Sequence, residues 1–167
     1  TPDLLTDLPT ATWCPVVVDP LRWTAAARPP RSGPLRVAHA PSVGPVKGTG
    51  LIMPTLQRLA DEGVITLELV QGVASSQMPT VFANADVVID QFRVGSYGVA
   101  ACEAMAAGCV VVGHVTDRVR DAVAEHTGLV LPIVDATPDT LDTTLRELAA
   151  LPSLDEASAA GLNFVTK

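Results

Sequence analysis

Short runs of consecutive apolar residues recur along this chain, and segments with helical character separate them. The runs are rich in Val, Ile and Leu and cover residues 35–40, 64–70, 87–90, 109–115 and 130–134. A strand buried on both faces has this continuous pattern because neither face meets water. Strands that alternate with helices form right-handed βαβ units. The sequence therefore predicts an α/β fold: a Rossmann-like three-layer domain with a mostly parallel sheet.

The segments between the runs carry the boundary residues of helices. Helices are expected at residues 47–62, 75–84, 97–107, 117–126, 137–151 and 153–162. Gly63 and Gly128 follow two of them, at the position where glycine commonly ends a helix. Pro54 lies inside the first and predicts a late start or a kink.

The first 34 residues differ from the rest of the chain. A short capped helix is expected to start within residues 1–8, and residues 15–18 have a strand-like pattern. Residues 20–34 are rich in Pro, Arg and Ala, which is typical of a linker, with Leu21 and Trp23 docking on the domain. We therefore divide the chain into an interdomain segment and linker, residues 1–34, and one domain, residues 35–167. Because the chain begins without Met, we expect it to be a fragment of a longer protein.

Composition and charge exclude several classes of protein. With 167 residues, 48% of them hydrophobic and 17% charged, the chain is long enough for one domain with a real core. A net charge of −7 disfavours a nucleic-acid partner. No export signal and no apolar run near 18 residues is evident, so we expect a cytoplasmic protein. Cys14, Cys102 and Cys109 form no CxxC pair, so neither a disulfide framework nor a zinc site is expected.

Candidate chemistry gathers after the predicted strands, where parallel α/β folds bind their ligands. Lys47 and Gly48 come after the first strand of the regular region, and Lys167 is the only other lysine. At a helix start, a lysine followed by glycine can place an ammonium group beside a phosphate that the backbone N–H groups also face. After the second strand, the small loop at residues 70–73 could receive a nucleobase or be an ordinary turn.

The stretch at residues 95–108 is the most specific part of the sequence. Glycine and small residues lead into a helix, whose N-terminus is a suitable site for a phosphate. Glu103 lies on the same helix, which is expected to pack on the sheet, so its carboxylate needs a partner or a ligand such as a hydroxyl. His114, Thr116 and Asp117 follow the fourth strand; we interpret them as structural, with Asp117 as a helix cap.

Two other classes of protein fit less well. Asp90 ends the third strand, where a receiver-type signalling domain carries its phosphoacceptor aspartate. Such a domain should also have an acidic pair after the first strand and a lysine after the fifth, but this chain has His39-Ala40 and Ile133-Val134-Asp135 there. A dinucleotide-binding enzyme is disfavoured because no GxGxxG follows the first strand.

At these residues the chain resembles the C-terminal domain of GT-B-fold glycosyltransferases with a Glu-x7-Glu motif, the group 1 or family 4-like enzymes. That group typically reads Glu-Gly-Phe-Gly-(x)4-Glu-Ala-Met-Ala-x-Gly, followed by Pro-Val-Val. This chain reads Gly95-Ser96-Tyr97-Gly98-(x)4-Glu103-Ala104-Met105-Ala106-Ala107-Gly108, followed by Cys109-Val110-Val111-Val112. Lys47-Gly48-Thr49 and the segment at residues 85–90 are also similar. The resemblance covers about residues 35–134.

The resemblance implies the donor-binding domain of a glycosyltransferase of the hexosyltransferase type. Glu103 would hold the ribose hydroxyls, Lys47 would meet the diphosphate, and the loop at residues 70–73 would flank the base. The implied donor nucleotide-binding residues are Lys47, Gly48, Ser42, Val70, Gly72, Ser96, Tyr97, Gly98, Val99 and Glu103. The substrate would be a nucleotide diphosphate sugar, without a cofactor or metal. The partner would be the missing N-terminal GT-B domain, which would supply the acceptor site and any peripheral membrane association. No catalytic residue is assigned within this chain, which we expect to be inactive alone.

The chain departs from the group's pattern at two positions. The first Glu of the motif falls on Gly95, and the Arg that commonly precedes the lysine by five residues falls on Ser42. These departures affect contacts to the donor sugar and to the diphosphate rather than to the ribose. They favour the alternative function, a nucleotide-binding or scaffold domain that retains the fold without catalysis.

Overall fold

The computed structural model describes residues 2–5, 7–8, 10–24, 29–41 and 44–167. Its centre is a five-stranded sheet in which every neighbouring pair of strands is parallel. The strands are β1 (Leu35–His39), β2 (Ile65–Leu69), β3 (Val87–Ile89), β4 (Val110–Gly113) and β5 (Val134–Asp135), in the spatial order β2-β1-β3-β4-β5. The predicted α/β fold with a mostly parallel sheet is therefore confirmed.

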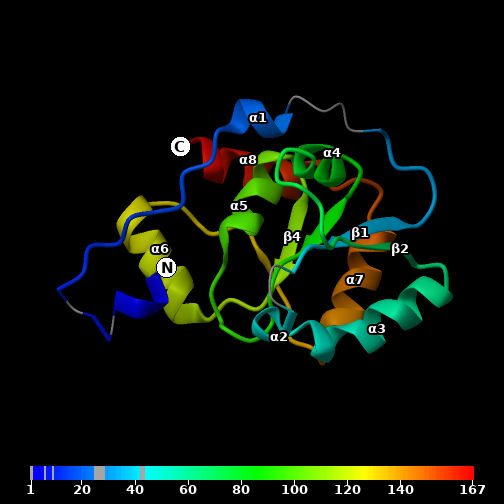
Figure 1. The fold of residues 1–167 in the computed structure, drawn as a ribbon, viewed down its shortest axis with the longest axis horizontal. Coiled ribbons are helices and arrows are strands. Elements are labelled where there is room, and N and C mark those ends of the chain that lie inside the picture. The colour runs from blue at the N-terminus through cyan, green and yellow to red at the C-terminus, as the bar shows by residue number, and fades with distance from the viewer. Residues whose placement is uncertain (1, 6, 9, 25–28, 42–43) are drawn as a thin grey trace.

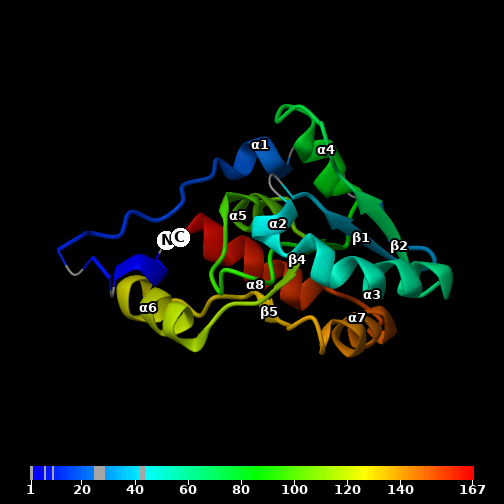
Figure 2. The same cartoon turned by 60° about the horizontal axis from the view of Figure 1, so that its bottom comes forward.

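Helices flank the sheet on both faces (Figure 1). The helical segments are η1 (Pro2–Leu5), α1 (Pro20–Thr24), α2 (Gly44–Lys47), α3 (Thr49–Asp61), α4 (Met78–Ala83), α5 (Val99–Ala106), α6 (Asp117–Thr127), α7 (Leu141–Ala150) and α8 (Asp155–Thr166). Helices α3 and α7 lie together below the sheet in the turned view, and α1 and α4 lie above it (Figure 2). These layers are the three expected of a Rossmann-like domain.

The sheet separates two apolar cores because successive side chains of a strand point to opposite faces. On β1, Val37 packs with the α3 and α7 side chains, whereas Ala38 packs with α4 and α5. On β4, Val112 and Val111 divide in the same way. All four of these side chains are at most 2% exposed. The sequence thus has continuous apolar runs because both faces of the sheet are covered.

Several boundaries differ from the sequence expectations. The strand-like residues 15–18 form no strand, and the fifth strand begins only at Val134, near the end of the expected segment 130–134. The helix expected at 47–62 is α3, which has the late start that Pro54 predicted: it begins at Thr49 and ends at Asp61. Helix α2 is a separate turn before it, so Lys47 ends a helix rather than starting one. Gly48, with φ 75°, separates the two helices. Helix α7 begins at Leu141 rather than 137, since the preceding residues form a turn that Thr137 and Thr140 stabilise with mutual hydrogen bonds.

The segment expected to be a linker contains the short helix α1. Trp23 is only 2% exposed and stacks on Phe82 of α4, with 5.7 Å between the ring centroids. Leu21 does not dock as expected, because it is 79% exposed. The large apolar surface of the indole ring explains why α1 is held against the domain. Among the residues that the structure describes, no helix is both long enough and apolar enough to cross a membrane.

Candidate functional site

The candidate site lies where β1 and β3 end side by side. In the sheet, β1 lies between β2 and β3. The chain passes from β1 to β2 on one side of β1 and then crosses to β3 on its other side, so the strand order reverses between β1 and β3. A reversal of this kind opens a crevice at the carboxyl ends of the strands, which is the usual ligand site of open parallel sheets. The residues that follow β1 and β3 are therefore the candidates for this site.

Lys47 and Asp90 meet across this crevice. Lys47 ends α2, after β1, and its ammonium group forms an ion pair with the carboxylate of Asp90, directly after β3. The Asp90 side chain is 2% exposed, and its second oxygen accepts a hydrogen bond of 3.1 Å from the Gly98 N–H. Asp90 thus lies between the ammonium group and the start of α5. From its position after a strand, Asp90 could be considered only as a phosphoacceptor; its pairing with Lys47 was not predicted.

His39, at the end of β1, connects the segments beside the crevice through hydrogen bonds of its ring. Its ring is fully buried, with Nδ1 3.0 Å from the Ile89 carbonyl oxygen and Nε2 2.9 Å from the Thr49 hydroxyl oxygen. A carbonyl only accepts, so Nδ1 carries the proton and Nε2 accepts from Thr49. Burial lowers the pKa of His39, with the Lys47 charge a smaller cause in the same direction. The neutral ring therefore ties β1 to β3 and to the first residue of α3.

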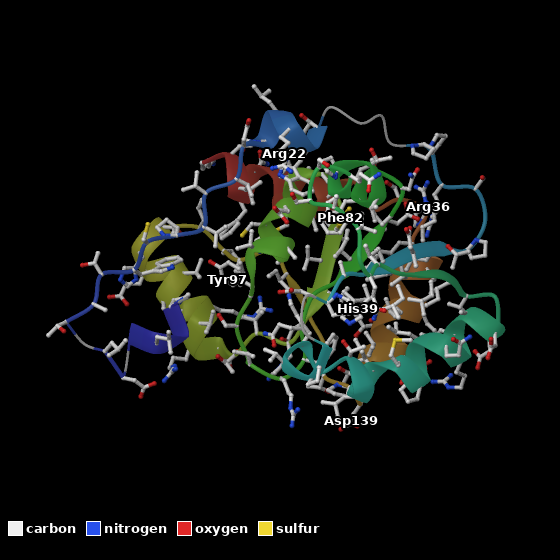
Figure 3. The ribbon with its side chains drawn as sticks, viewed as in Figure 1. Arg22, Arg36, His39, Phe82, Tyr97 and Asp139 are labelled. Carbon is white, nitrogen blue, oxygen red and sulfur yellow. The ribbon has the colours of Figure 1, made fainter. Side chains whose placement is uncertain are left out.

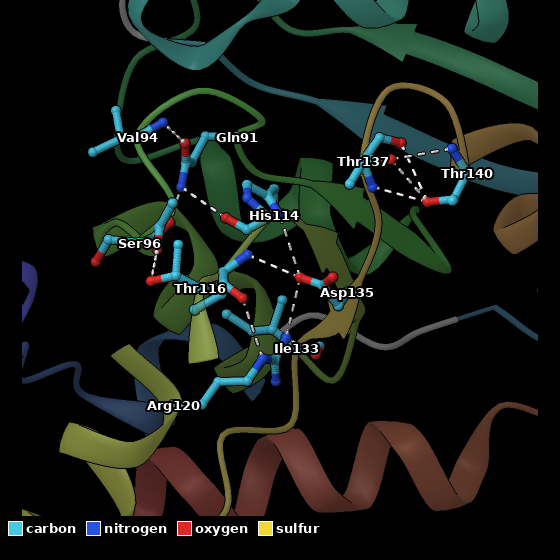
Figure 4. Close-up of polar contacts among 12 residues, drawn as sticks. Gln91, Val94, Ser96, His114, Thr116, Arg120, Ile133, Asp135, Thr137 and Thr140 are labelled. Atoms are coloured by element: carbon cyan, nitrogen blue, oxygen red, sulfur yellow. Dashed lines mark hydrogen bonds and ion pairs between the residues drawn. The ribbon is translucent and has the colours of Figure 1, made fainter. Parts of the chain in front are cut away.

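Gln91 shapes the loop that leads from β3 into α5 (Figure 4). Its side-chain oxygen Oε1 accepts from the backbone N–H groups of Arg93 and Val94, at 3.1 and 2.7 Å. Its amide nitrogen donates to the carbonyl oxygens of Ser96 and His114. A buried side chain, 5% exposed, thus fixes both ends of the turn. A polar residue directly after a buried strand is the sequence signal that could have pointed to it.

Gly95 occupies the tightest point of the same loop. It has φ 73°, and a Cβ atom built there would lie 2.8 Å from Cγ2 of Thr116. Thr116 also donates to the Gly95 carbonyl oxygen from its N–H, at 2.9 Å, and from its hydroxyl, at 3.2 Å. Thr116 is the N-cap residue of α6, and Asp117, expected to be the cap, begins the helix. Thr116 therefore fills the space beside Gly95 where any side chain would begin.

Beyond the loop, the ends of β4 and β5 are joined through Asp135. Its carboxylate accepts from the Val115 N–H at 3.0 Å and lies 3.6 Å from both His114 Nδ1 and Arg120 Nη2 (Figure 4). Arg120 also donates to the Ile133 carbonyl oxygen at 2.9 Å. These contacts support the structural interpretation of His114.

A small cavity of about 140 Å³ opens between α2 and the loop. Its lining residues are Val46, Lys47, Gln91, Val94, Ser96, Tyr97 and Gly98. The structure therefore brings together four of the predicted site residues: Lys47, Ser96, Tyr97 and Gly98. Tyr97 is 6% exposed, and burial raises the pKa of its hydroxyl to about 12, so the ring stays neutral. Gly48 lies buried beside this group, against Phe92.

Glu103 lies further along α5, half-buried and facing the N-terminal segment. Burial raises the pKa of its carboxyl group, and the charge of Arg22 on α1 opposes this rise. Arg22 donates to the Ser75 carbonyl oxygen at 2.8 Å, in the loop after β2. Figure 3 labels Arg22 on α1 and Tyr97 just before α5 begins. Helix α5 thus places its N-terminus beside Lys47 and its carboxylate near the loop after β2.

The remaining predicted residues are more scattered. Val70 is buried and joins the sheet, where its N–H donates to the His39 carbonyl oxygen at 2.9 Å. Gly72 is exposed with φ 69°, and Val99 is 54% exposed at the start of α5. Ser42 lies outside the described residues. Within the described ranges, no three His, Cys, Asp or Glu side chains are placed to hold a metal ion.

A larger cavity of about 520 Å³ lies behind Tyr97, between the N-terminal segment and the end of α8. Its walls are mainly apolar and include Trp13, Val16, Cys102 and Phe164. Tyr97 lines both this cavity and the small one beside Lys47. Tyr97 is therefore a wall residue that the two cavities share.

Comparisons with known proteins agree with this geometry. The family described as Glycosyl transferases group 1 matches residues 41–150, more than half of the chain. No curated protein sequence matches the chain. Among solved structures, WaaG, a glycosyltransferase involved in lipopolysaccharide biosynthesis, is similar with a TM-score of 0.61 at 13% identity, over 92% of this chain and 51% of WaaG.

Two further structures show the same fold. The C-terminal domain of LpcC, a glycosyl transferase group 1 family protein from Francisella tularensis, has a TM-score of 0.54 at 17% identity, over 91% of this chain and 93% of that domain. The catalytic domain of starch synthase IV from Arabidopsis thaliana, bound to ADP and acarbose, has a TM-score of 0.54 at 11% identity. The match covers 88% of this chain and 37% of the starch synthase chain. The chain thus spans about half the length of WaaG but nearly all of an isolated C-terminal domain.

Proposed function

Because the chain belongs to the group 1 glycosyl transferases, we propose that it is the donor-binding domain of an enzyme that transfers a sugar from a nucleotide diphosphate to an acceptor hydroxyl. One observation carries the proposal: Lys47, the small cavity and the N-terminus of α5 converge at the point where the strand order reverses. The similarity of this chain to an isolated C-terminal domain supports the same assignment.

The diphosphate would bind beside Lys47 at the start of α5. Val99 and Ala100 begin this helix, where backbone N–H groups lack intrahelical acceptors and face an incoming anion. An ammonium group has three N–H donors, so Lys47 can keep Asp90 and still donate to a phosphate oxygen. The Gly98 N–H lies at the same helix start, but it already donates to Asp90. Lys47 and the helix N-terminus would thus share the phosphate.

In the transfer, the bond between the anomeric carbon and the phosphate oxygen breaks as the acceptor oxygen bonds to that carbon. Negative charge then develops on the leaving diphosphate, and a fixed ammonium group beside it lowers the barrier. The acceptor hydroxyl loses its proton to a base, which we place in the other half of the enzyme together with the acceptor site. Within this chain we assign no metal and no cofactor to the reaction.

Glu103 would bind the ribose of the donor. A carboxylate accepts hydrogen bonds from two hydroxyl groups at once, and Glu103 is half-buried, so such bonds would be partly shielded from water. The loop after β2, with Val70 and Gly72 at its beginning, would flank the base. Residues 1–34 would link the two halves of the enzyme.

Calorimetric titration of the protein with UDP, GDP, ADP and TDP tests the proposal. We expect at least one nucleotide to bind, and Glu103→Ala to weaken it at least tenfold, because each hydrogen bond to a charged group contributes about 1.5–3 kcal/mol. Glu125→Gln, an exposed acidic residue on α6, is the control and should bind as the wild type does. No heat with any nucleotide from folded protein would contradict the proposal.

A second candidate is a nucleotide-binding domain without catalysis. Two observations favour it: Gly95 offers no carboxylate to a donor sugar, and Asp90 already neutralises Lys47. The two candidates differ in turnover of the intact protein with a panel of nucleotide sugars. Transfer that is lost in Glu103→Ala supports the enzyme, whereas nucleotide binding without any transfer supports the second candidate.

A further inference from the structure

Arg22 is a charged side chain at the edge of the candidate site, and the fold uses its hydrogen-bonding capacity only in part. It lies on α1, and its Nη2 donates to the Ser75 carbonyl oxygen at 2.8 Å, in the loop after β2. Within the part of the chain that the structure describes, this is the one hydrogen bond of its side chain. A guanidinium group carries several N–H donors in one plane and no acceptor. The exposed Arg22 therefore has donors left for a ligand.

The guanidinium group of Arg22 is held in place before any ligand arrives. The next residue, Trp23, is 2% exposed and stacks on Phe82, so α1 is anchored to the domain. Cζ of Arg22 lies 5.6 Å from the centroid of the Trp23 ring, and the bond to Ser75 fixes the end of the side chain. A side chain that is ordered in this way loses little conformational entropy when it binds a ligand.

Glu103 of α5 lies close to Arg22 but does not pair with it. Helix α1 packs against α5, and the Arg22 side chain extends from α1 toward α5 (Figure 3). The Arg22 charge lowers the pKa of the Glu103 carboxyl group, against the larger effect of burial, which raises it. Among the described residues, the Glu103 carboxylate neither accepts a hydrogen bond nor forms an ion pair. A carboxylate and a guanidinium group thus stand near each other, and both can bind the same ligand.

The ligand that suits this pair has donors at one end and acceptors at the other. Under the proposed function, the ribose hydroxyls donate to Glu103, and the base extends toward the loop after β2, to which Arg22 is bound. Guanine, uracil and thymine carry an exocyclic carbonyl oxygen, which accepts hydrogen bonds, whereas adenine and cytosine carry an amino group on the corresponding edge. An amino group directed at the guanidinium group would bring donor against donor. The chemistry of Arg22 therefore favours a base with a carbonyl oxygen.

We propose that Arg22 donates a hydrogen bond to an exocyclic carbonyl oxygen of the nucleobase and so makes the site selective for guanine, uracil or thymine nucleotides. The proposal rests on the proposed function and adds to it the class of base and a specificity-determining residue. This residue comes from the segment that the sequence predicts to be a linker. The docked helix α1 thereby completes the nucleotide site of the domain that follows it.

Calorimetric titration of the protein with UDP, GDP, ADP and CDP tests the base preference directly. We expect UDP or GDP to bind about tenfold or more tightly than ADP and CDP, because the site directs a charged donor at the base edge. In Arg22→Gln, the new side chain offers an acceptor as well as donors, so an amino group is no longer rejected. The preference should therefore fall to within about threefold. Trp23 anchors α1 in both proteins, so the variant should melt as the wild type does.

Arg58→Gln is the matched control. Arg58 is an exposed arginine of α3, on the other face of the sheet, where it pairs with Glu62 and Asp142. This variant should keep the base preference of the wild type. Equal binding of all four nucleotides by the wild type would overturn the role of Arg22, and the proposed function would stand. A loss of affinity by the same factor for every nucleotide in Arg22→Gln would also overturn it, because Arg22 would then act through its charge alone. If the folded wild type binds none of the four, both proposals fail.

Discussion

Gly95→Ala should destabilise the protein for two separable reasons. The first is the backbone, because an L residue at φ 73° costs about 1–2 kcal/mol relative to glycine. The second is Thr116, whose Cγ2 would lie 2.8 Å from the new Cβ. Rotating Thr116 away would break its hydroxyl bond to the Gly95 carbonyl oxygen, which contributes about 1 kcal/mol. Alanine also stiffens the unfolded chain, and this effect offsets about 0.4–1 kcal/mol of the loss. The net loss in the free energy of unfolding is about 2 kcal/mol.

Thr116→Ser separates the two contributions. Serine lacks Cγ2 but keeps the hydroxyl that bonds the Gly95 carbonyl oxygen, so Gly95→Ala in this background should lose only about 1 kcal/mol, the backbone part. Urea unfolding of the four proteins, followed by circular dichroism, gives the free energy of unfolding of each. The single Gly95→Ala variant should also melt about 4–8 °C below the wild type, as expected for a domain of this size.

Two results would refute the reasoning. Independent sites add to within about 0.5 kcal/mol, so an equal loss in both backgrounds would show that Thr116 does not limit the space beside Gly95. A neutral Gly95→Ala in both backgrounds would refute the left-handed conformation itself. If the reasoning holds, an acidic residue at this position requires a different path of the loop as well as a smaller neighbour.

Two further predictions concern stability away from this loop. The lowered pKa of His39 means that the folded protein binds a proton there less readily than the unfolded chain; stability should therefore fall as pH drops below the ordinary histidine pKa of 6.5. Urea unfolding between pH 5 and 8 should show a weaker pH dependence for His39→Gln, and an identical slope would contradict the assignment. Asp86→Asn should cost about 2 kcal/mol, because Asp86 is 6% exposed and binds the Arg36 guanidinium with both oxygens, at 2.6 and 2.9 Å. Asp142→Asn, in an exposed ion-pair network, should cost less than about 1 kcal/mol, and equal losses in the two variants would refute the distinction.

The central strands and helix α5 could be predicted from the sequence because their residues are buried on both sides. Runs such as Val110-Val111-Val112 leave no polar face, and few structures other than a covered parallel strand accept such a run. Gly128 likewise ends α6 in the left-handed conformation that glycine adopts most readily. Local chemistry determines both features, so local patterns predict them.

Contacts between distant segments could not be predicted. Lys47 and Asp90 are 43 positions apart, and their pairing depends on β1 and β3 being neighbours, which no local pattern reveals. The same holds for Thr116, which excludes a side chain at Gly95 across 21 positions. At residues 130–134 the local pattern predicted too long a strand. Leu131 and Ile133 are buried in a core, but only Val134 and Asp135 pair with β4. Apolar residues there fill space without joining the sheet.

The pairing of Lys47 with Asp90 has a consequence for how the crevice discriminates among ligands. The ammonium group has already left most of its hydration shell in the free protein, since its side chain is 14% exposed and a carboxylate accompanies it. An incoming anion therefore displaces little water from this lysine and meets a cation whose charge is already balanced. Attraction by charge alone is weak under these conditions, so free phosphate or sulfate gains little here. Under the proposed function, selectivity would instead come from a ligand that reaches several fixed donors at once, so that its shape would matter more than its charge.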